Sequence, residues 1–314
     1  MSGYANHDRR GLHLNLRESD NRYGIETMVN DLGNPTIFGG RGFVRPLLQT
    51  ENNNLLTRFE IGGTYLTDID PDSSDDNEEP LNVVGGDIGF PIYETSTFRL
   101  DLYNDYAVLN PPSKIDFLNI KQTKIDDEEA TSELAWGNAV GIGFAHTKAL
   151  FKFEYRILSD GYIPGVFDYT YETGMPVFWG LDNDIGARQG VFTQLIWHPL
   201  KQLYFLSAFE NYSNNTSKIY LGVSESGLIP RLGFRAYYTK RNIGHDSNNN
   251  FFQDLIDLDE KSALNLEIRY AIFPPVETIL IKEYRFRRVE TDDGISEFEP
   301  IHKTTFMVGV STNF

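Results

Sequence analysis

Apolar and polar residues alternate with a period of two along most of the chain. The alternation is clearest in the segments SALNLEIRYAIF (262–273), ALFKFEYRI (149–157) and RLGFRAYYTK (231–240). Successive side chains of a β-strand point to opposite faces of a sheet, so each segment has one apolar face and one polar face. The pattern predicts an all-β fold whose strands are about ten residues long, which exceeds the usual strand length in soluble domains.

Short and long connections alternate between these segments. Prolines lie at the short turns. Proline has no backbone N–H, and a residue at the end of a strand does not need one to pair with the neighbouring strand. These prolines are Pro46, Pro91, Pro199, Pro274 and Pro275. Longer and mostly acidic connections, such as residues 68–80, separate the hairpins. We therefore expect short turns at one end of the sheet and long loops at the other, in strict alternation.

The number of alternating segments predicts a single up-and-down antiparallel sheet. Counting from Tyr23 to Phe314 gives about fourteen strands, within a range of roughly twelve to sixteen. With an even number of strands, the first strand begins and the last strand ends at the same end of the sheet. Residues 1–20 are an N-terminal extension whose segment GLHLNLRE (11–18) alternates and forms an extra strand, a plug or a tether. Residues 21–314 form the main domain.

Alternation alone fits two kinds of all-β protein. A soluble sandwich turns its apolar face inward, whereas a transmembrane barrel turns that face toward lipid. Segment length, the many Phe, Tyr and Leu residues on the apolar faces and the order of the loops favour a transmembrane antiparallel up-and-down β-barrel. No run of apolar residues is long enough for a membrane-spanning helix, and the mean hydropathy of -0.37 agrees.

The last residues, FMVGVSTNF (306–314), alternate to the end of the sequence. This stretch resembles the carboxy-terminal signature of bacterial outer-membrane β-barrel proteins, although Thr312 stands where many of them have a larger apolar residue. The signature residues are Phe306, Val308, Val310 and Phe314. The resemblance implies a bacterial outer-membrane location, with outer-membrane lipid and the barrel-assembly machinery as partners. We expect the last strand to pair with the first, with Phe314 at the membrane boundary.

A second resemblance is confined to one stretch near the start. Residues 30–47, NDLGNPTIFGGRGFVRPL, are similar to a segment of spirochaete-type barrels. Within this stretch we attribute the GGRGF sequence (39–43) to glycine-rich turn chemistry. We assign Gly141 and Gly143, in VGIGF, to an inward face where small residues leave room for neighbouring side chains.

The charge and composition of the chain limit the kinds of partner and cofactor that it can bind. The chain has 28 basic and 45 acidic residues, a net charge of -17, which argues against a nucleic-acid surface. It contains no cysteine, so a disulfide framework and a thiolate metal site are excluded, and no cofactor is implied. The first residues, MSGYANHDRR, contain no apolar segment typical of a signal peptide, so the chain is either cytosolic or has a processed or engineered start. We favour an expression start placed on a mature domain, because Met1 precedes Ser-Gly.

Charged residues occupy the face opposite the apolar one. Unpaired charges are too costly for a dry interior, so we expect them to line a water-filled lumen. The predicted lumen residues are Arg58, Glu60, Arg99, Asp101, Lys152, Glu154, Arg156, Arg231, Arg235, Glu267, Arg269, Glu283, Arg285 and Arg287. We interpret them as the lining of a porin-like channel for passive diffusion of small polar or ionic solutes. The alternative is structural: cross-strand pairs that brace the wall.

One acidic connection is a candidate cation-binding loop. Its carboxylates are Asp70, Asp72, Asp75, Asp76, Glu78 and Glu79. They lack the spacing and turn glycine of an EF-hand, so a solvated surface loop is the favoured interpretation and no metal site is assigned. Acidic loops that gather at one mouth would concentrate cations there.

Three other functions compete with the channel. A surface-exposed adhesin or ligand-binding barrel would act through the long acidic loops. A transporter of hydrophobic solutes would need an apolar pocket, which these strands do not suggest. An enzyme is not expected, because no catalytic motif accompanies the histidines. These are His7, His13, His146, His198, His245 and His302.

Overall fold

The computed structural model describes most of the chain. The described residues are 11–48, 55–70, 80–110, 134–165, 186–214, 216–243, 251–259, 261–273, 276–290 and 296–310. They form fifteen strands in one sheet, with one short 3-10 helix and one short α-helix. Among these residues, no helix is both long enough and apolar enough to cross a membrane.

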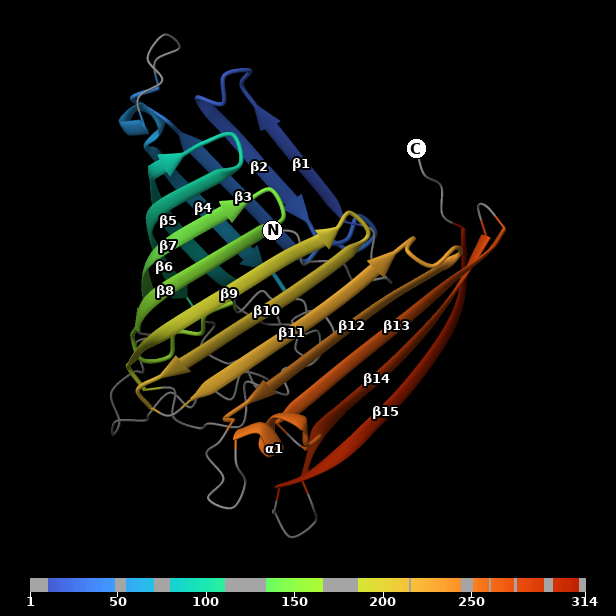
Figure 1. The fold of residues 1–314 in the computed structure, drawn as a ribbon. Coiled ribbons are helices and arrows are strands. Elements are labelled where there is room, and N and C mark those ends of the chain that lie inside the picture. The colour runs from blue at the N-terminus through green and yellow to red at the C-terminus, as the bar shows by residue number, and fades with distance from the viewer. Residues whose placement is uncertain are drawn as a thin grey trace, which may run out of the picture. The chain divides into compact units, whose positions relative to one another are not determined.

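The strands follow one another along the chain (Figure 1). Their bounds are β1 Leu12–Arg17, β2 Tyr23–Val29, β3 Ile37–Val44, β4 Glu60–Asp68, β5 Leu81–Glu94, β6 Phe98–Asn110, β7 Ala135–His146, β8 Ala149–Leu158, β9 Arg188–Leu200, β10 Leu203–Tyr212, β11 Ser217–Ser226, β12 Leu232–Arg241, β13 Ser262–Phe273, β14 Val276–Glu290 and β15 Ser296–Val310. The helices are η1 Leu55–Arg58 and α1 Phe251–Ile256. Every strand from β4 to β15 has between nine and fifteen residues.

Each strand is hydrogen-bonded to the next one in sequence. The registers from β1 to β6 and from β9 to β15 are antiparallel. The predicted all-β, up-and-down antiparallel sheet is therefore confirmed. Fourteen strands, β2 to β15, follow Tyr23, and β1 adds a fifteenth from the alternating segment near the start.

The predicted pairing of the last strand with the first is not formed by the described residues. The strand order begins at β1 and ends at β15, and each of these has one neighbour. The even count behind this expectation is also wrong, because β1 makes the number of described strands odd. In an up-and-down sheet of fifteen strands β1 and β15 run in the same direction, so a pair between them would be parallel and not the antiparallel ladder that an even count allows.

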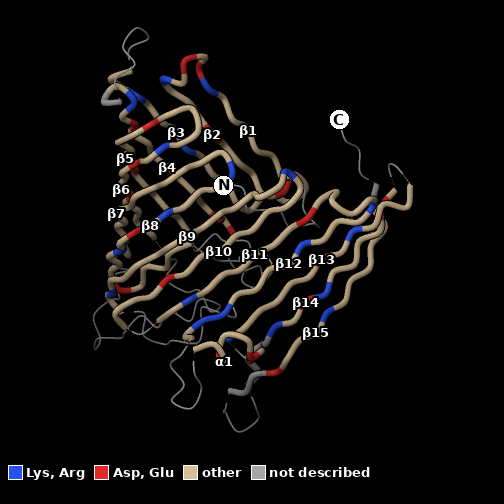
Figure 2. Tube along the Cα trace, viewed as in Figure 1, with Lys and Arg blue, Asp and Glu red and all other residues tan. Residues whose placement is uncertain are grey.

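The chain forms two compact units. The first contains Met1–Phe144 and Glu154–Gln189, and the second contains Ala145–Phe153 and Gly190–Phe314. In each unit one side of the sheet, here called the apolar face, carries aliphatic and aromatic side chains, and the other, the charged face, carries most of the ion pairs. Charged residues recur along the strands of both units (Figure 2).

The apolar face is the exposed one. In the first unit Ile25 in β2 is 57% exposed and Tyr155 in β8 is 42% exposed, whereas Glu154 is only 6% exposed. In the second unit Tyr270 is 46% exposed and Glu267 is 3% exposed. A soluble sandwich requires the opposite arrangement, with apolar side chains inside and ions outside. The exposures therefore contradict the soluble alternative.

The lengths of the connections depart from strict alternation at three places. The connection between β3 and β4, at the short-turn end by strand direction, has fifteen residues, which include η1. At the long-connection end, only five residues separate β14 from β15, and only four separate β10 from β11. This turn is short because Asn214 closes it: its Oδ1 accepts the Thr216 hydroxyl at 2.6 Å, and Thr216 O accepts Tyr212 N at 2.9 Å.

Glycines make room on both faces of the first unit. The assignment of GGRGF (39–43) to a turn is wrong, because these residues lie within β3. Gly42 of β3 lies opposite Gly63 of β4. The two glycines leave a part of the apolar face without side chains, and they do not form a turn. On the charged face, a Cβ on Gly141 would lie 2.3 Å from Tyr103 Cζ, which confirms that this glycine gives room to a neighbour.

Candidate functional site: a charge ladder on the charged face

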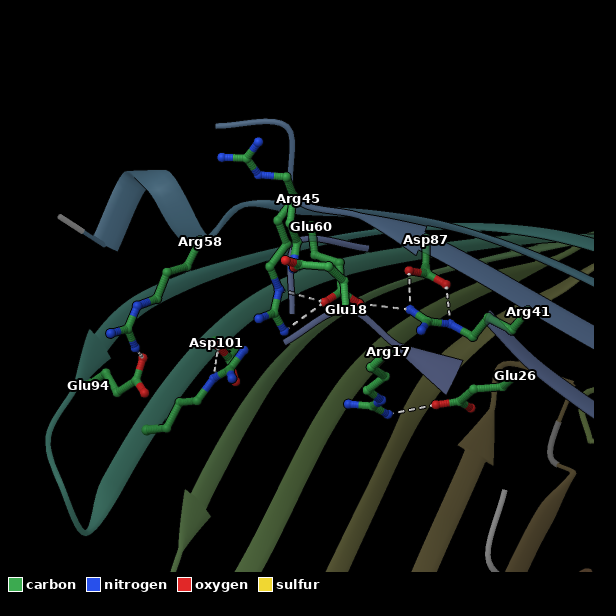
Figure 3. Close-up of polar contacts among 12 residues, drawn as sticks. Arg17, Glu18, Glu26, Arg41, Arg45, Arg58, Glu60, Asp87, Glu94 and Asp101 are labelled. Carbon is green, nitrogen blue, oxygen red and sulfur yellow. Dashed lines mark hydrogen bonds and ion pairs between the residues drawn. The ribbon is translucent and has the colours of Figure 1, made fainter. Parts of the chain in front are cut away.

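Three arginines and three carboxylates form a ladder across β1 to β5 in the first unit. The register places Glu26 of β2 opposite Arg41 of β3, and Gly62 of β4 opposite Asp87 of β5. Arg17 precedes the β1–β2 turn and Glu60 opens β4, on the same face. Figure 3 shows that these side chains point toward one another from neighbouring strands.

Arg41 is the central residue of the ladder. Its Nη2 lies 3.0 Å from Glu60 Oε1 and 2.8 Å from Asp87 Oδ2, and its Nε donates to Asp87 Oδ1 at 3.2 Å. Arg45 binds the other oxygen of Glu60 at 3.0 Å. Arg17 binds Glu26 at 2.7 Å. Three positive and three negative charges therefore neutralise one another along this part of the face.

Phe43 holds the three guanidinium groups in place. The carbons at the centres of the guanidinium groups of Arg17, Arg41 and Arg45 lie 5.5, 5.6 and 5.7 Å from the centroid of the ring. The ring is only 6% exposed, and it lies over Gly24, where a Cβ would approach within 2.4 Å. Cation–π contacts of this kind favour a fixed arrangement of the arginines.

Two further ion pairs lie toward the short turns of the first unit. Arg58 pairs with Glu94 of β5, and Arg99 Nε donates to Asp101 Oδ1 at 2.7 Å within β6. Arg58 lies in η1, so it reaches Glu94 from the connection before β4 and not from the strand itself. Its side chain is 31% exposed, and that of Glu94 is 27% exposed.

Tyr103 joins β6 to β8 on the charged face. Its hydroxyl donates to Glu154 Oε1 at 2.8 Å, and Arg156 Nη2 lies 2.6 Å from Glu154 Oε2. The ring occupies the space above Gly141. Lys152 precedes Glu154 by two residues and so shares its face. Every predicted lumen residue of β6 and β8 therefore lies on the charged face.

The second unit carries a smaller set of charges. Glu267 pairs with Arg269, whose Nη1 lies 3.8 Å from Glu277 Oε1. Arg235 of β12 is opposite Glu267 in the register. Glu283 lies 4.0 Å from Lys303. These contacts place the predicted residues of β12, β13 and β14 together on one face.

Of the other predicted residues of this unit, one lies outside the strands and two follow Glu283 on the same face of β14. Arg231 is exposed in the turn before β12, at a φ of 67°, so it lies outside the strand. Arg285 in β14 is not exposed, and its Nε atom has no hydrogen-bond partner among the described residues. Arg287 is in β14 opposite Glu299, and its side chain is outside the described part.

The remaining predicted sites lie at the margins of the structure. Asp70 is exposed just after β4, whereas Asp72, Asp75, Asp76, Glu78 and Glu79 are outside the described residues. The described residues contain no group of three potential metal ligands. Phe306 and Val308 in β15 are 67% and 64% exposed on the apolar face. Val310 ends β15, and Phe314 lies outside the described residues.

Sequence reasoning missed the central residues of the ladder. These are Arg17, Glu26, Arg41, Arg45 and Asp87. Arg17 and Glu26 each follow a bulky apolar residue and could have been predicted from the alternation, whereas Arg41 and Asp87 could not. A usable signal was present, because Arg41 and Asp87 are single charges among glycines in IFGGRGFV and GGDIGF. A glycine opposite such a charge leaves space for it, as Gly62 does for Asp87, whose Oδ2 lies 2.3 Å from where a Cβ would be.

Comparisons with known proteins identify no family. No family model matches the chain, and no curated protein matches it. Similar solved structures include the TodX monoaromatic hydrocarbon channel deltaS2 mutant, at 10% identity over 95% of this chain and 86% of that chain, with a TM-score of 0.38. Another is the outer membrane protease OmpT from Escherichia coli, at 8% identity over 95% of this chain and 89% of that chain, with a TM-score of 0.20. At these TM-scores neither likeness carries an argument about function.

Proposed function

We propose that the chain is an outer-membrane β-barrel that acts as a porin-like channel for passive diffusion of small polar or ionic solutes. The observation that carries the proposal is the inverted exposure of the two faces. Large aliphatic and aromatic side chains of the apolar face are exposed, while most of the paired charged side chains of the charged face are half-buried or buried. Lipid is the medium that favours such an apolar surface.

The aromatic residues of the apolar face support this medium. In a membrane barrel, aromatic side chains form girdles where the apolar band meets water. In the first unit, Tyr23 and Tyr93 lie toward the short turns. Tyr65 and Trp136 lie toward the long connections. The Tyr65 hydroxyl donates to Asn82 Oδ1 at 2.8 Å, so its polar atom is satisfied.

The second unit shows the same distribution. Trp197, Tyr270 and Phe273 lie near the short turns, and Tyr238 and Tyr284 lie near the long connections. Tyr270 and the position opposite Tyr238 in β13 are six residues apart, or roughly 20 Å of strand. This length suits an apolar band of about 25 Å.

A polar pair within the apolar face is satisfied internally. Asn104 of β6 donates to Asn138 Oδ1 at 3.2 Å, and Asn138 donates to Asn104 Oδ1 at 3.3 Å. Each amide also donates to a backbone carbonyl, of Ala139 and Asp105 respectively. An unpaired amide would be costly in hydrocarbon, so this pairing is what a lipid-facing position requires.

The charged face supports an aqueous path. Arg41, Glu60 and Asp87 are each about a fifth exposed, so water reaches them although they are paired. Charges that are accessible to water and fixed by strands set a local field that acts on permeating ions. The pairing of opposite charges within the ladder also favours a channel of weak selectivity.

Conductance in planar bilayers tests the proposal. Purified protein that migrates faster on gels when unheated than when heated should produce stable open-channel steps. Folded, inserted protein that produces no steps would refute the channel and would favour the adhesin or ligand-binding alternative. Uptake of an apolar solute by vesicles without ion conductance would instead favour the hydrophobic-solute transporter.

A further inference from the structure

Lys240 lies on the apolar face of β12, at the start of the long connection to β13. The register pairs Tyr238 with Leu264 and Lys240 with Ser262, so Lys240 shares a face with Tyr238. An ammonium group at the margin of an apolar face requires partners. Lys240 is nevertheless 0% exposed, so something in the structure covers it.

The connection between β12 and β13 supplies these partners. Lys240 Nζ lies 2.9 Å from Asp254 Oδ1 and 3.0 Å from Asp259 Oδ2, and it donates to the carbonyl oxygen of Asp257 at 2.8 Å. An ammonium group has three donors, and these contacts use all three. Asp254 lies in α1 and is only 1% exposed. The carboxylates of Asp254 and Asp259 therefore point inward, toward the apolar face.

Backbone contacts fix the same segment, residues 251–259, against the sheet. The Tyr238 hydroxyl donates to the carbonyl oxygen of Leu255. Ser262 Oγ donates to Asp259 Oδ1 at 2.7 Å, and Asp259 N donates to Ser262 Oγ at 3.2 Å. Figure 1 shows α1 beside the ends of β12 and β13. We call residues 251–259 the anchor segment.

The other side of the anchor segment is apolar and exposed. Phe252 and Ile256, four residues apart on α1, are 74% and 76% exposed. Phe251 and Leu258 are 43% and 45% exposed. Asp254 and Asp259 point inward, while Phe252 and Ile256 point outward, which is the inversion that the strands show; the side chains of Gln253 and Asp257 are also exposed. In water this arrangement would be unfavourable, because it exposes apolar side chains and buries charges.

We propose that the anchor segment is a membrane-interface anchor whose Phe252 and Ile256 side chains enter the lipid at the long-connection end of the apolar face. The inference rests on the proposed function, because it takes the apolar face to be in contact with lipid. Lipid is the occupant that continuity favours: the segment lies directly on Tyr238, which belongs to the apolar face. Short amphipathic segments with aromatic residues are typical of the headgroup boundary.

Spin labelling tests the anchor in the full-length protein. The chain has no cysteine, so Ile256→Cys gives one labelled site without background reactivity. Asn214→Cys, in the turn between β10 and β11 at the same end of the strands, is the matched aqueous control. Ile268→Cys, in the middle of β13 on the apolar face, reports whether the protein is inserted. Each variant is reconstituted in phosphatidylcholine vesicles, and the ratio of accessibility to oxygen and to a water-soluble nickel chelate is measured.

The anchor predicts a ratio at residue 256 close to that at residue 268 and well above that at residue 214. A ratio at residue 256 equal to that at residue 214, with a high ratio at residue 268, would refute the anchor and leave the membrane assignment intact. This result would also be expected if a protein partner covers the segment. Low ratios at all three residues would refute the membrane assignment itself.

Discussion

Removing the central arginine of the ladder should change both stability and ion selectivity. In Arg41→Gln, Asp87 loses two hydrogen bonds from the guanidinium and Glu60 keeps only Arg45. Hydrogen bonds to charged groups contribute about 1.5 to 3 kcal/mol each, and the partial exposure of these groups reduces that contribution. We therefore expect the free energy of unfolding in urea to fall by about 2 to 3 kcal/mol.

The same substitution changes the charge of the ladder from neutral to -1. At about 10 Å in water one charge acts on a permeating ion with roughly 0.4 kcal/mol, or about a factor of two in local concentration. The local concentration of cations rises and that of anions falls by this factor. The permeability ratio of cations to anions should therefore rise roughly fourfold at low salt, and less at 0.1 M, where the Debye length is about 10 Å. Reversal potentials across a salt gradient measure this ratio.

Two controls separate the ladder from general charge effects. Lys201→Gln removes the same charge from the turn between β9 and β10, and it should leave the permeability ratio nearly unchanged. Arg41→Gln with Asp87→Asn restores neutrality, so it should recover the wild-type ratio and part of the stability. An Arg41→Gln protein whose selectivity matches that of Lys201→Gln would refute the placement of the ladder along the solute path.

Three further experiments test other parts of the structure. Ile268→Arg on the apolar face should lower the free energy of unfolding in vesicles by about 2 to 4 kcal/mol, while Asn265→Arg on the charged face should cost much less; equal losses would contradict the assignment of faces. Asn104→Leu should destabilise the protein by about 1 to 3 kcal/mol, because it leaves Asn138 unpaired. The double variant with Asn138→Leu should recover most of that loss, and a loss in the double variant equal to the sum of the two single losses would contradict the pairing. If the membrane-inserted sheet closes through β1 and β15, pairs of cysteines with one on each strand should cross-link in a parallel register, in which the partner positions advance in the same direction. An antiparallel pattern of cross-links would contradict the strand count.

The sequence predicts the sheet because the alternation is a local property. In β13, every second residue from Leu264 to Ile272 is apolar, and the structure places these residues on one face. The strand order follows because each hairpin joins neighbours in the sequence. Closure is not local, so the even count and the pairing of the last strand with the first could not be read from any single segment.

The candidate site was predictable only where charges alternate with bulky residues. Glu154 and Arg156 stand out in ALFKFEYRI, but Arg41 is surrounded by glycines, and its partners are nineteen and forty-six residues away. The arrangement of the anchor segment is similarly hidden. The alternation places Lys240 on the face of Tyr238, but only the contacts show that Asp254 and Asp259 cover its ammonium group. Contacts across strands determine these features, whereas periodicity reports only the direction of each side chain.

The orientation of the two faces is tested most directly by scanning one strand. Single cysteines at consecutive positions from Asn265 to Tyr270 of β13 can be labelled in vesicles, because the chain has no other thiol. A water-soluble, membrane-impermeant maleimide should react at residues 265, 267 and 269, and a lipid-soluble quencher should reach labels at residues 266, 268 and 270. Water access at residues 266, 268 and 270, with protection of the alternate residues, would contradict the assignment of the apolar face to lipid.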